Sequence, residues 1–376
     1  MKKIIILCGL LLISTISFAE TYIPPGAVSG IWTFPNSPYI IDGEINIPID
    51  STLIIEPGVQ VLFSGHYKFY IYGRILAVGT ASDTITFTAQ NTTIGWYGLE
   101  IFNTNSSGQD SSKVVYCKLK YVNISRICGA IYFFNSSSHL IKNCLITQNI
   151  TRGIYCHDNS SPIIKNVTIT GNTGGLYCIN NSNPDLEDIT IIGNTGTGIS
   201  CFDSSPNLEN VVIKKNKAYG GGGIYCNNAN LSLSNVTITS NFATNSGGGI
   251  CCTGNSSVNF DPDNRCNIFL NYAGIGNDLY AFDCPPINVI VDTFTILEPD
   301  QNFACPIDNF TFDILNGKVE QVDNDLYVSP DGSDDNSGLS PDDPLLTISW
   351  ALIKIYADSI SPVSYTHLTL PTICSV

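Results

Sequence analysis

Two glutamates occupy equivalent positions in neighbouring repeats of this sequence, and they are its candidates for catalytic chemistry. Glu187 and Glu209 hold these positions, and Lys165 holds the same position one repeat earlier. Carboxylates on successive repeats can raise one another's pKa and serve as an acid/base pair, as in glycoside cleavage. A solvated, salt-bridged row of charges is the favoured alternative, because the sequence supplies no second basic group or substrate-binding arginine beside the pair.

Four tyrosines are the candidates for ligand binding. Tyr132, Tyr155, Tyr177 and Tyr225 each follow an apolar residue of the repeat, whereas a serine and a cysteine hold this position in two other repeats. Because alternate residues of a strand point to opposite faces, the tyrosines should face outward. Regularly spaced aromatic rings can stack on sugar rings. A tyrosine ladder that only stabilises the sheet, or that a loop covers, is the alternative and the favoured one.

A cluster of aspartates near the C-terminus is the candidate metal site. Asp331, Asp334 and Asp335 lie in one short segment, and calcium prefers clustered oxygen ligands. The spacing of an EF-hand loop is absent, so an acidic surface turn is the favoured alternative. The sequence holds no Cys-x-x-Cys pair and no Cys/His cluster for zinc. We therefore predict no cofactor, with calcium left open.

A repeat of nearly constant length must position these candidates. The pattern Asn-x-x-[Ile/Val]-x-x-Asn begins at residues 143, 166, 188, 210 and 235, with an aspartate at 188, and successive copies are 22 to 25 residues apart. This period is too short for a pair of helices and is typical of one coil of a solenoid. Stacked coils are therefore the expected scaffold.

Each repeat contains three short apolar or β-branched stretches, separated by Asn and Gly, which tolerate the left-handed backbone of tight corners. One inward-facing residue per stretch defines three columns. The columns are Ile141, Ile164, Leu186, Leu208 and Leu233; Ile146, Ile169, Ile191, Ile213 and Ile238; and Ile131, Ile154, Leu176, Ile199, Ile224 and Ile250. We predict an all-β fold, a right-handed parallel β-helix of three strands per coil, with hydrogen-bonded Asn ladders at its corners.

Five of the fourteen cysteines form another column, two residues after the third-stretch Ile or Leu. They are Cys156, Cys178, Cys201, Cys226 and Cys252. The period-two rule places them inside the tube as small buried hydrophobes. Free thiols are favoured over disulfides, because a flat parallel ladder does not readily supply the geometry of an unstrained bridge.

The N-terminus and the composition indicate export. Residues 1–19 combine a basic start, an apolar run and the small-x-small ending Ser17-Phe18-Ala19, as a secretory signal peptide does. No later stretch is apolar for long enough to span a membrane as a helix. The formal net charge of −15 argues against nucleic-acid partners. Sparse charge and many hydroxyl and amide side chains suit either glycan contact or an inert wall.

Several phrases resemble known families. Ser51 to Val59 and the segment Gly95-Trp96-Tyr97-Gly98-Leu99 resemble the opening coils of secreted bacterial β-helix proteins of the pectin-lyase-like type. Gly247-Gly248-Gly249-Ile250, preceded by Phe242-Ala243-Thr244-Asn245, resembles the repeats of polymorphic outer-membrane adhesins. The pectin-lyase-like resemblance implies a polysaccharide-related activity on one outer face, and the adhesin resemblance implies a surface protein.

A second start follows the repeats. Leu326 to Pro341 resembles the entry segment of another pectin-lyase-like β-helix, with a cap helix expected at about Leu346 to Tyr356. The predicted organisation is a signal peptide at 1–19, an N-terminal cap and first coils at 20–110, a repeat domain at 111–318 and a truncated second β-helix at 319–362. Residues 363–376 resemble a translated sequencing-library adapter, so they are left out of the fold prediction and the natural chain is expected to be longer.

Three functions fit these observations. The preferred one is an exported, secreted or cell-surface β-helix that binds a polysaccharide or cell-surface glycan without cleaving it, as an adhesin does. The second is a polysaccharide lyase or glycoside hydrolase that uses the face of Glu187 and Glu209. The third is a structural spacer without a ligand. An anchor or sorting module is expected in the missing C-terminal part.

Overall fold

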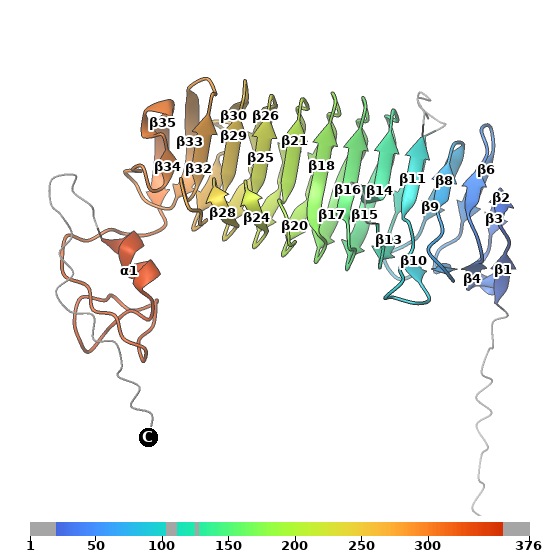
Figure 1. Ribbon diagram of the computed structural model, residues 1–376, viewed down its shortest axis with the longest axis horizontal. Helices are drawn as coiled ribbons and strands as arrows, with labels where there is room; N and C mark the ends of the chain where they lie inside the picture. Colours follow the sequence, from blue (N-terminus) through green and yellow to red (C-terminus); the bar gives the residue numbers. More distant parts are fainter. Residues whose placement is uncertain (1–19, 103–110, 125–127, 356–376) are drawn as a thin grey trace, which may run out of the picture.

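A computed structural model of the chain describes residues 20–102, 111–124 and 128–355. The residues up to the end of β35 form a long tube of stacked coils, with β1 at one end and β35 at the other (Figure 1). All strand pairings between named strands are parallel, and parallel crossovers are right-handed for steric reasons. The predicted all-β, right-handed parallel β-helix is therefore confirmed.

One face of the tube is a 12-stranded sheet, which we call sheet B. Its strands are β2 (Gly26–Ala27), β5 (Ile45–Ile47), β8 (Phe69–Ile71), β11 (Leu99–Phe102), β14 (Gly129–Phe134), β16 (Arg152–His157), β18 (Gly174–Ile179), β21 (Ile199–Phe202), β25 (Ile224–Asn227), β29 (Ile250–Thr253), β32 (Leu279–Phe282) and β34 (Ala304–Cys305). Strand β11 pairs with β14, so the coils on either side of residues 103–110 belong to one solenoid.

The other two faces form a continuous 21-stranded sheet, because β15 and β17 run through the corner between them. Its strands are β1 (Thr21–Ile23), β3 (Gly30–Trp32), β4 (Tyr39–Ile41), β6 (Thr52–Ile55), β7 (Gln60–Phe63), β9 (Arg74–Val78), β10 (Ile85–Ala89), β12 (Lys113–Val115), β13 (Cys117–Lys120), β15 (Leu140–Thr147), β17 (Ile163–Thr170), β19 (Asp185–Glu187), β20 (Thr190–Ile192), β22 (Asn207–Glu209), β23 (Val212–Lys214), β26 (Asn230–Ser234), β27 (Thr237–Thr239), β30 (Ser257–Phe260), β31 (Cys266–Phe269), β33 (Ile287–Phe294) and β35 (Phe310–Gly317).

The corner between these two faces is a single residue in the left-handed conformation. The first residue of each predicted repeat has positive φ, from 49° at Asn166 to 58° at Asp188. Asparagine and aspartate tolerate this conformation better than other residues with a Cβ atom. Neighbouring corner amides are hydrogen-bonded, for example from Asn166 Nδ2 to Asn143 Oδ1 at 2.7 Å. The corner role predicted for these residues is confirmed.

The closing asparagines of the repeat form a second, buried ladder. The ladder comprises Asn149, Asn172, Asn194, Asn216, Asn241 and Asn271, each with its side chain inside the tube. At four of its five links the side-chain amide donates to the next Oδ1 at 2.9–3.0 Å, and at the link from Asn172 the backbone N–H donates at 2.9 Å. Buried amides are thus paired with one another and with backbone carbonyls.

The core follows the predicted columns. All three sets of inward Ile and Leu residues are buried, and their register pairs them coil by coil. The five column cysteines are also buried, and the described cysteines are free thiols. Nearer the N-terminus the interior contains aromatic rings. Trp96, for example, stacks on Phe63 with ring centroids 4.2 Å apart. Stacking therefore makes one continuous apolar interior.

A short extra sheet protrudes where the repeat lengthens. It consists of β24 (Lys217–Gly220) and β28 (Phe242–Ser246), and the bridges from Phe242 to Tyr272 and from Ser246 to Ile275 extend it. This is where the glycine-rich, adhesin-like phrase lies. The triplets that follow each strand contain glycines that sit against the next coil; a Cβ on Gly222, for example, would lie 2.7 Å from the carbonyl oxygen of Gly248.

After β35 the chain leaves the tube and forms a small lobe beside its C-terminal end (Figure 1). Its helix α1 (Ile348–Lys354) lies within the predicted cap-helix range, and Thr347 caps it by accepting a hydrogen bond from the Trp350 N–H. The short 3-10 turns η1 (Phe34–Asn36) and η3 (Ile307–Asn309) complete the described elements. The predicted signal peptide at 1–19 and the adapter-like residues 363–376 lie outside the described residues.

Candidate functional site

The four predicted tyrosines share one column on the outside of sheet B. Tyr132 pairs with Tyr155, Tyr155 with Tyr177, and the column continues through Ser200 to Tyr225. Toward the N-terminus the column passes through the buried Glu100 to Tyr70, and toward the C-terminus it passes through Cys251 to Tyr280. Their common direction follows from the parallel register, in which equivalent residues of successive coils lie about 4.8 Å apart.

A second aromatic column lies beside the first, and the sequence analysis missed it. It contains Phe102, Phe134, His157, Phe202 and Phe282, each two residues after a member of the first column. The period of two along a strand could have revealed it. The rings of the two columns from Tyr70 to Tyr225, together with Tyr72, form the aromatic strip, in which each ring contacts another with no break. Its members are Tyr70, Tyr72, Phe102, Tyr132, Phe134, Tyr155, His157, Tyr177, Phe202 and Tyr225.

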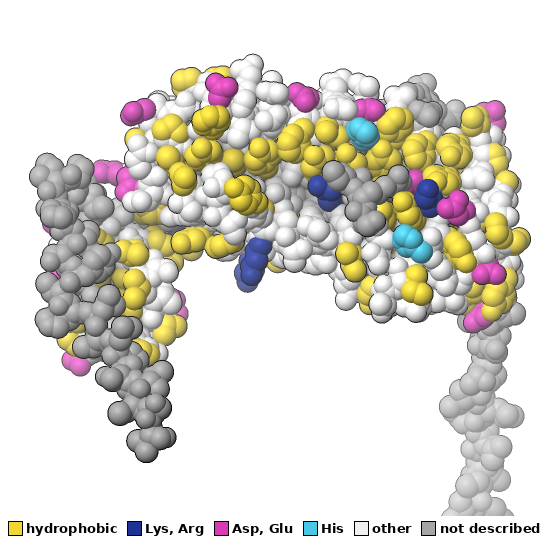
Figure 2. Space-filling view, in the orientation of Figure 1, with side chains coloured by type: hydrophobic (Ala, Val, Ile, Leu, Met, Phe, Trp, Pro, Cys, Tyr) yellow, Lys and Arg dark blue, Asp and Glu magenta, His cyan; other side chains and the backbone are white. Residues whose placement is uncertain are grey.

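Figure 2 shows a band of hydrophobic side chains that follows the long axis of the tube. The rings of the strip are not equally open. Tyr155 is only 6% exposed, because it stacks on Tyr132 at 5.3 Å and meets Tyr177 edge-on at 4.9 Å. Burial raises the pKa of Tyr155 to about 12. Tyr155 thus faces outward as expected but is covered by its neighbours, whereas Tyr177, Phe202 and Tyr225 are half-buried.

A groove of about 290 Å³ runs along one side of the strip. The Arg152 guanidinium lies 4.3 Å from the ring centre of Tyr177 and supplies a cation at the groove. Glycines form the floor, since a Cβ on Gly175 would lie 2.1 Å from the carbonyl oxygen of Gly198 on the next coil. Thr197 and Ser200 add hydroxyl groups. The groove therefore combines hydrogen-bonding groups with an adjacent aromatic wall.

His157 is the imidazole within the strip. Its Nδ1 lies 2.9 Å from the Tyr132 hydroxyl, and its Nε2 lies 3.3 Å from Asp158 Oδ1. Its ring also stacks on Tyr155 at 5.6 Å. These contacts fix the imidazole within the aromatic strip.

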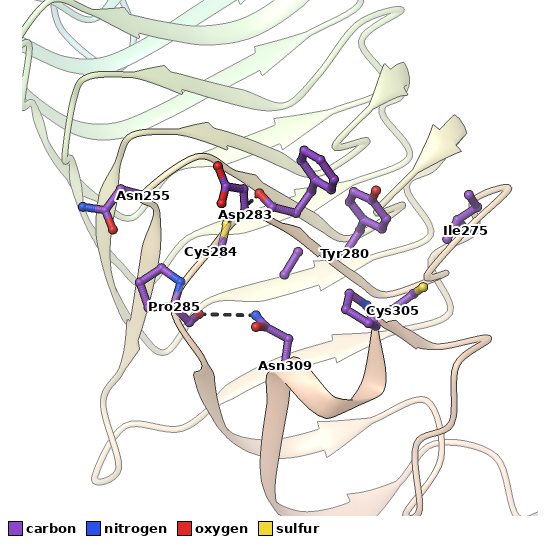
Figure 3. A pocket seen from close by; sticks show the side chains of 11 residues that line it. Asn255, Ile275, Tyr280, Asp283, Cys284, Pro285, Cys305 and Asn309 are labelled. Carbon is purple, nitrogen blue, oxygen red and sulfur yellow. Dashed lines mark hydrogen bonds between the residues drawn. The ribbon is translucent and has the colours of Figure 1, made fainter.

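A wider hollow, of about 640 Å³, lies at the C-terminal end of sheet B. Figure 3 shows Tyr280 on one side, Asn309 on the other, and Asp283, Cys284 and Cys305 around them. The Asn309 Nδ2 donates to the carbonyl oxygen of Pro285 at 3.3 Å. No feature of the repeat pointed to this hollow.

The predicted glutamates lie on a different face from the tyrosines. Glu187 and Glu209 are neighbours in the register of β19 and β22, as expected. The Lys165 ammonium donates to the Glu187 carboxylate, which raises the pKa of Lys165. Neither glutamate lines the groove or the hollow. Glu187 is half-exposed and ion-paired, and Glu209 is exposed on the outside of the same sheet.

The aspartates of the C-terminal segment act within their own loop. Asp334 accepts hydrogen bonds from the N–H groups of Leu346 and Thr347 and from the Thr347 hydroxyl, at 2.8–3.0 Å. Its two carboxylate oxygens thus anchor the start of α1. Asp331 and Asp335 lie in turns stabilised by serine hydroxyls. Within the described residues, no group of three or more His, Cys, Asp or Glu side chains is placed to hold a metal.

Comparison with known proteins supports the fold. Residues 82–264 match the family described as right handed beta helix region. This match covers 183 of the 376 residues and agrees with the fold of the stacked coils, a right-handed parallel β-helix. No curated protein matches the chain. Of the helices in the described residues, none has the length and apolarity needed to cross a membrane.

Three solved structures with some similarity to this chain are two epimerases and a bacteriophage tailspike. The Azotobacter vinelandii mannuronan C-5 epimerase AlgE4 A-module has 12% identity, with 79% of this chain and 86% of that chain covered and a TM-score of 0.35. The periplasmic alginate epimerase AlgG has 12% identity, coverage of 74% and 77%, and a TM-score of 0.27. Tailspike protein 2 of an Escherichia coli O157:H7 bacteriophage has 13% identity, coverage of 82% and 45%, and a TM-score of 0.32. Similarity at this level concerns the fold and carries no information about ligands.

Proposed function

We propose that the protein binds an extended polysaccharide along the aromatic strip without cleaving it. The observation that carries this proposal is the unbroken contact of ten rings on one face of the tube. Rigid rings with hydroxyl edges present apolar faces and hydrogen-bonding groups together, which is what sugar rings require. A linear ligand parallel to the axis meets a new coil about every 4.8 Å.

The open contacts lie in the middle of the strip. Tyr177, Phe202 and Tyr225 are half-buried, so part of each ring is free to touch a ligand. The adjoining groove adds Arg152 and the Ser200 hydroxyl within the same coils. The buried Tyr155 instead holds the neighbouring rings in place, as its contacts with Tyr132 and Tyr177 indicate. Binding is therefore assigned to the C-terminal half of the strip.

The acid/base alternative has less support. Neither glutamate lines the groove or the hollow, and Glu187 is already paired with Lys165. A catalytic carboxylate pair needs a site that holds a sugar between its members. We therefore propose a noncatalytic, adhesin-like binding protein, exported by residues 1–19 and acting outside the cell or on its surface.

Retention on immobilised polysaccharides tests the proposal. Wild-type protein should be retarded in gels that contain a suitable neutral or acidic polysaccharide. The double variant Tyr177→Ala/Tyr225→Ala should bind about tenfold more weakly, since each lost aromatic contact removes about 0.5–1.5 kcal/mol. Tyr219→Ala is the matched control, because Tyr219 is 76% exposed and lies on β24, outside the strip.

The same gels separate the other two functions. Glu187→Gln/Glu209→Gln should leave retention unchanged if the strip is the site. Release of reducing ends or unsaturated uronates that depends on Glu187 would establish the enzyme instead. Retention on none of a broad panel of plant, algal and bacterial polysaccharides would favour the structural spacer.

A further inference from the structure

The hollow at the end of sheet B lies where the aromatic columns stop. Tyr280 and Phe282 are the last aromatic residues of the two outward columns, on β32. The next strand, β34, pairs only through Ala304 and Cys305. Pro306 and the 3-10 turn η3 then follow, in the place where a full strand would continue. The hollow is therefore an end point of the same face that carries the strip.

The lining of the hollow differs from that of the groove at Arg152. Phe282 is 64% exposed, so it offers a more open ring than the half-buried rings of the strip. Asn255 and Asn309 add amides, and Asp283 is the one charged side chain among the lining residues. With an acidic group and no basic one, the hollow disfavours carboxylated or sulfated ligands by like-charge repulsion. An uncharged ligand with hydroxyl groups fits this lining.

The size of the hollow favours a small ligand over a protein partner. Its volume of about 640 Å³ lies within the range of small-molecule sites. A stable protein interface needs roughly 800 Å² from each partner, far more than the residues around this hollow provide. Aromatic rings with a few amide and carboxyl groups suit one or two sugar rings. The wall formed by η3 gives a bound chain a place to end.

We propose that the hollow binds the terminal, uncharged sugar unit of a glycan whose following units lie along the aromatic strip. This inference rests on the proposed glycan-binding function and adds to it a preference for chain ends and for neutral termini. The ring of Phe282 would stack on the terminal unit, and Asp283, Asn255 and Asn309 would receive or donate its hydroxyl hydrogen bonds.

Neutral oligosaccharides from cellulose, xylan and mannan, compared with the long polymers, test the inference by calorimetry. Phe282→Ala should weaken oligosaccharide binding about 2- to 10-fold, as expected for one lost aromatic contact. The same variant should leave retention on the long polymer nearly unchanged, because ends are rare there. Tyr219→Ala again serves as the exposed aromatic control, and unchanged melting temperatures check that both variants are folded.

A second pair of ligands tests the charge preference. Wild-type protein should bind a neutral oligosaccharide more tightly than the same chain ending in a uronic acid, and Asp283→Asn should reduce this difference. If Phe282→Ala weakens oligomer and polymer equally, or weakens neither while Tyr177→Ala/Tyr225→Ala still acts, the hollow is not an end site although the strip binds. If wild-type protein binds no glycan at all, the proposed function fails and this inference fails with it.

Discussion

The middle coils and the last coils of the tube share the same inward and outward columns. The middle coils keep the same residue types in each inward column, whereas the last coils replace some of them. From β15 to β27 each coil repeats an inward Ile or Leu, a ladder asparagine and a corner residue. In the last coils the ladder passes from Asn271 to Asp278, and the outward columns end at a hollow. The regular coils therefore bury and pair their polar groups uniformly, whereas the last coils contain a buried carboxyl group, Asp278, and an open hollow.

The largest difference should appear in the interior. Ile169→Asp, in the middle of the tube, buries an unpaired charge and should cost more than about 4 kcal/mol or prevent folding. Ile314→Asp, in the half-buried terminal strand β35, should cost markedly less, because water reaches the new carboxylate. Denaturant unfolding monitored by circular dichroism measures both. Equal losses would mean that the end coil is as closed as the middle.

The next largest effect concerns Asp278, which is fully buried at the end of the ladder. Desolvation raises its pKa to about 7, against the hydrogen bonds from Asn271 and Thr295 that lower it. The protonated form is thus favoured in the folded state. The stability that this group contributes to the folded protein is fully present below about pH 4 and is lost as the pH rises through 7. Between pH 5 and pH 8 the free energy of unfolding should fall by about 3 kcal/mol from this group.

Asp278→Asn isolates that contribution. An amide can still accept from Asn271 and donate to the Thr295 hydroxyl, which now donates to Asp278. The variant should fold, and the difference in unfolding free energy between pH 5 and pH 8 should shrink relative to wild type. An unchanged pH dependence would show that the carboxyl does not titrate in this range.

A smaller effect is expected within the regular ladder. Asn216→Ala removes the acceptor for the Asn194 side-chain and backbone N–H groups and the donor to Asn241. Leaving these buried groups unpaired should cost about 2 kcal/mol. Asn207→Ala, at an exposed position of β22, is the control and should change stability by less than about 0.5 kcal/mol. Similar losses for both would show that the ladder contributes little.

The regular part of this comparison could be read from the sequence. Each strand position recurs in successive coils, so the repeat predicts which way a side chain points. Ile169 and Cys178 point inward and Tyr177 points outward, as their register with the neighbouring coils shows. The burial of Tyr155 could not be predicted in the same way, because it depends on how neighbouring rings turn toward it. Asp278 and the hollow lay beyond reach for another reason. Both lie where the sequence repeat ends, and the repeat cannot predict the structure of residues that no longer follow it.

The hydrogen bonds of the buried asparagine ladder have a direction. At four of its five links a side-chain amide donates forward, to the Oδ1 of the next coil, and the same amide groups also donate back to backbone carbonyls of the preceding coil. The row ends with the Asn271 amide and backbone N–H directed at the Asp278 carboxylate, at 3.0 and 3.2 Å. These two donors lower the pKa of Asp278, but desolvation outweighs them and raises that pKa to about 7. The ladder thus runs in one direction along the tube and ends on a carboxyl group that would ionise more readily if water reached the end coil.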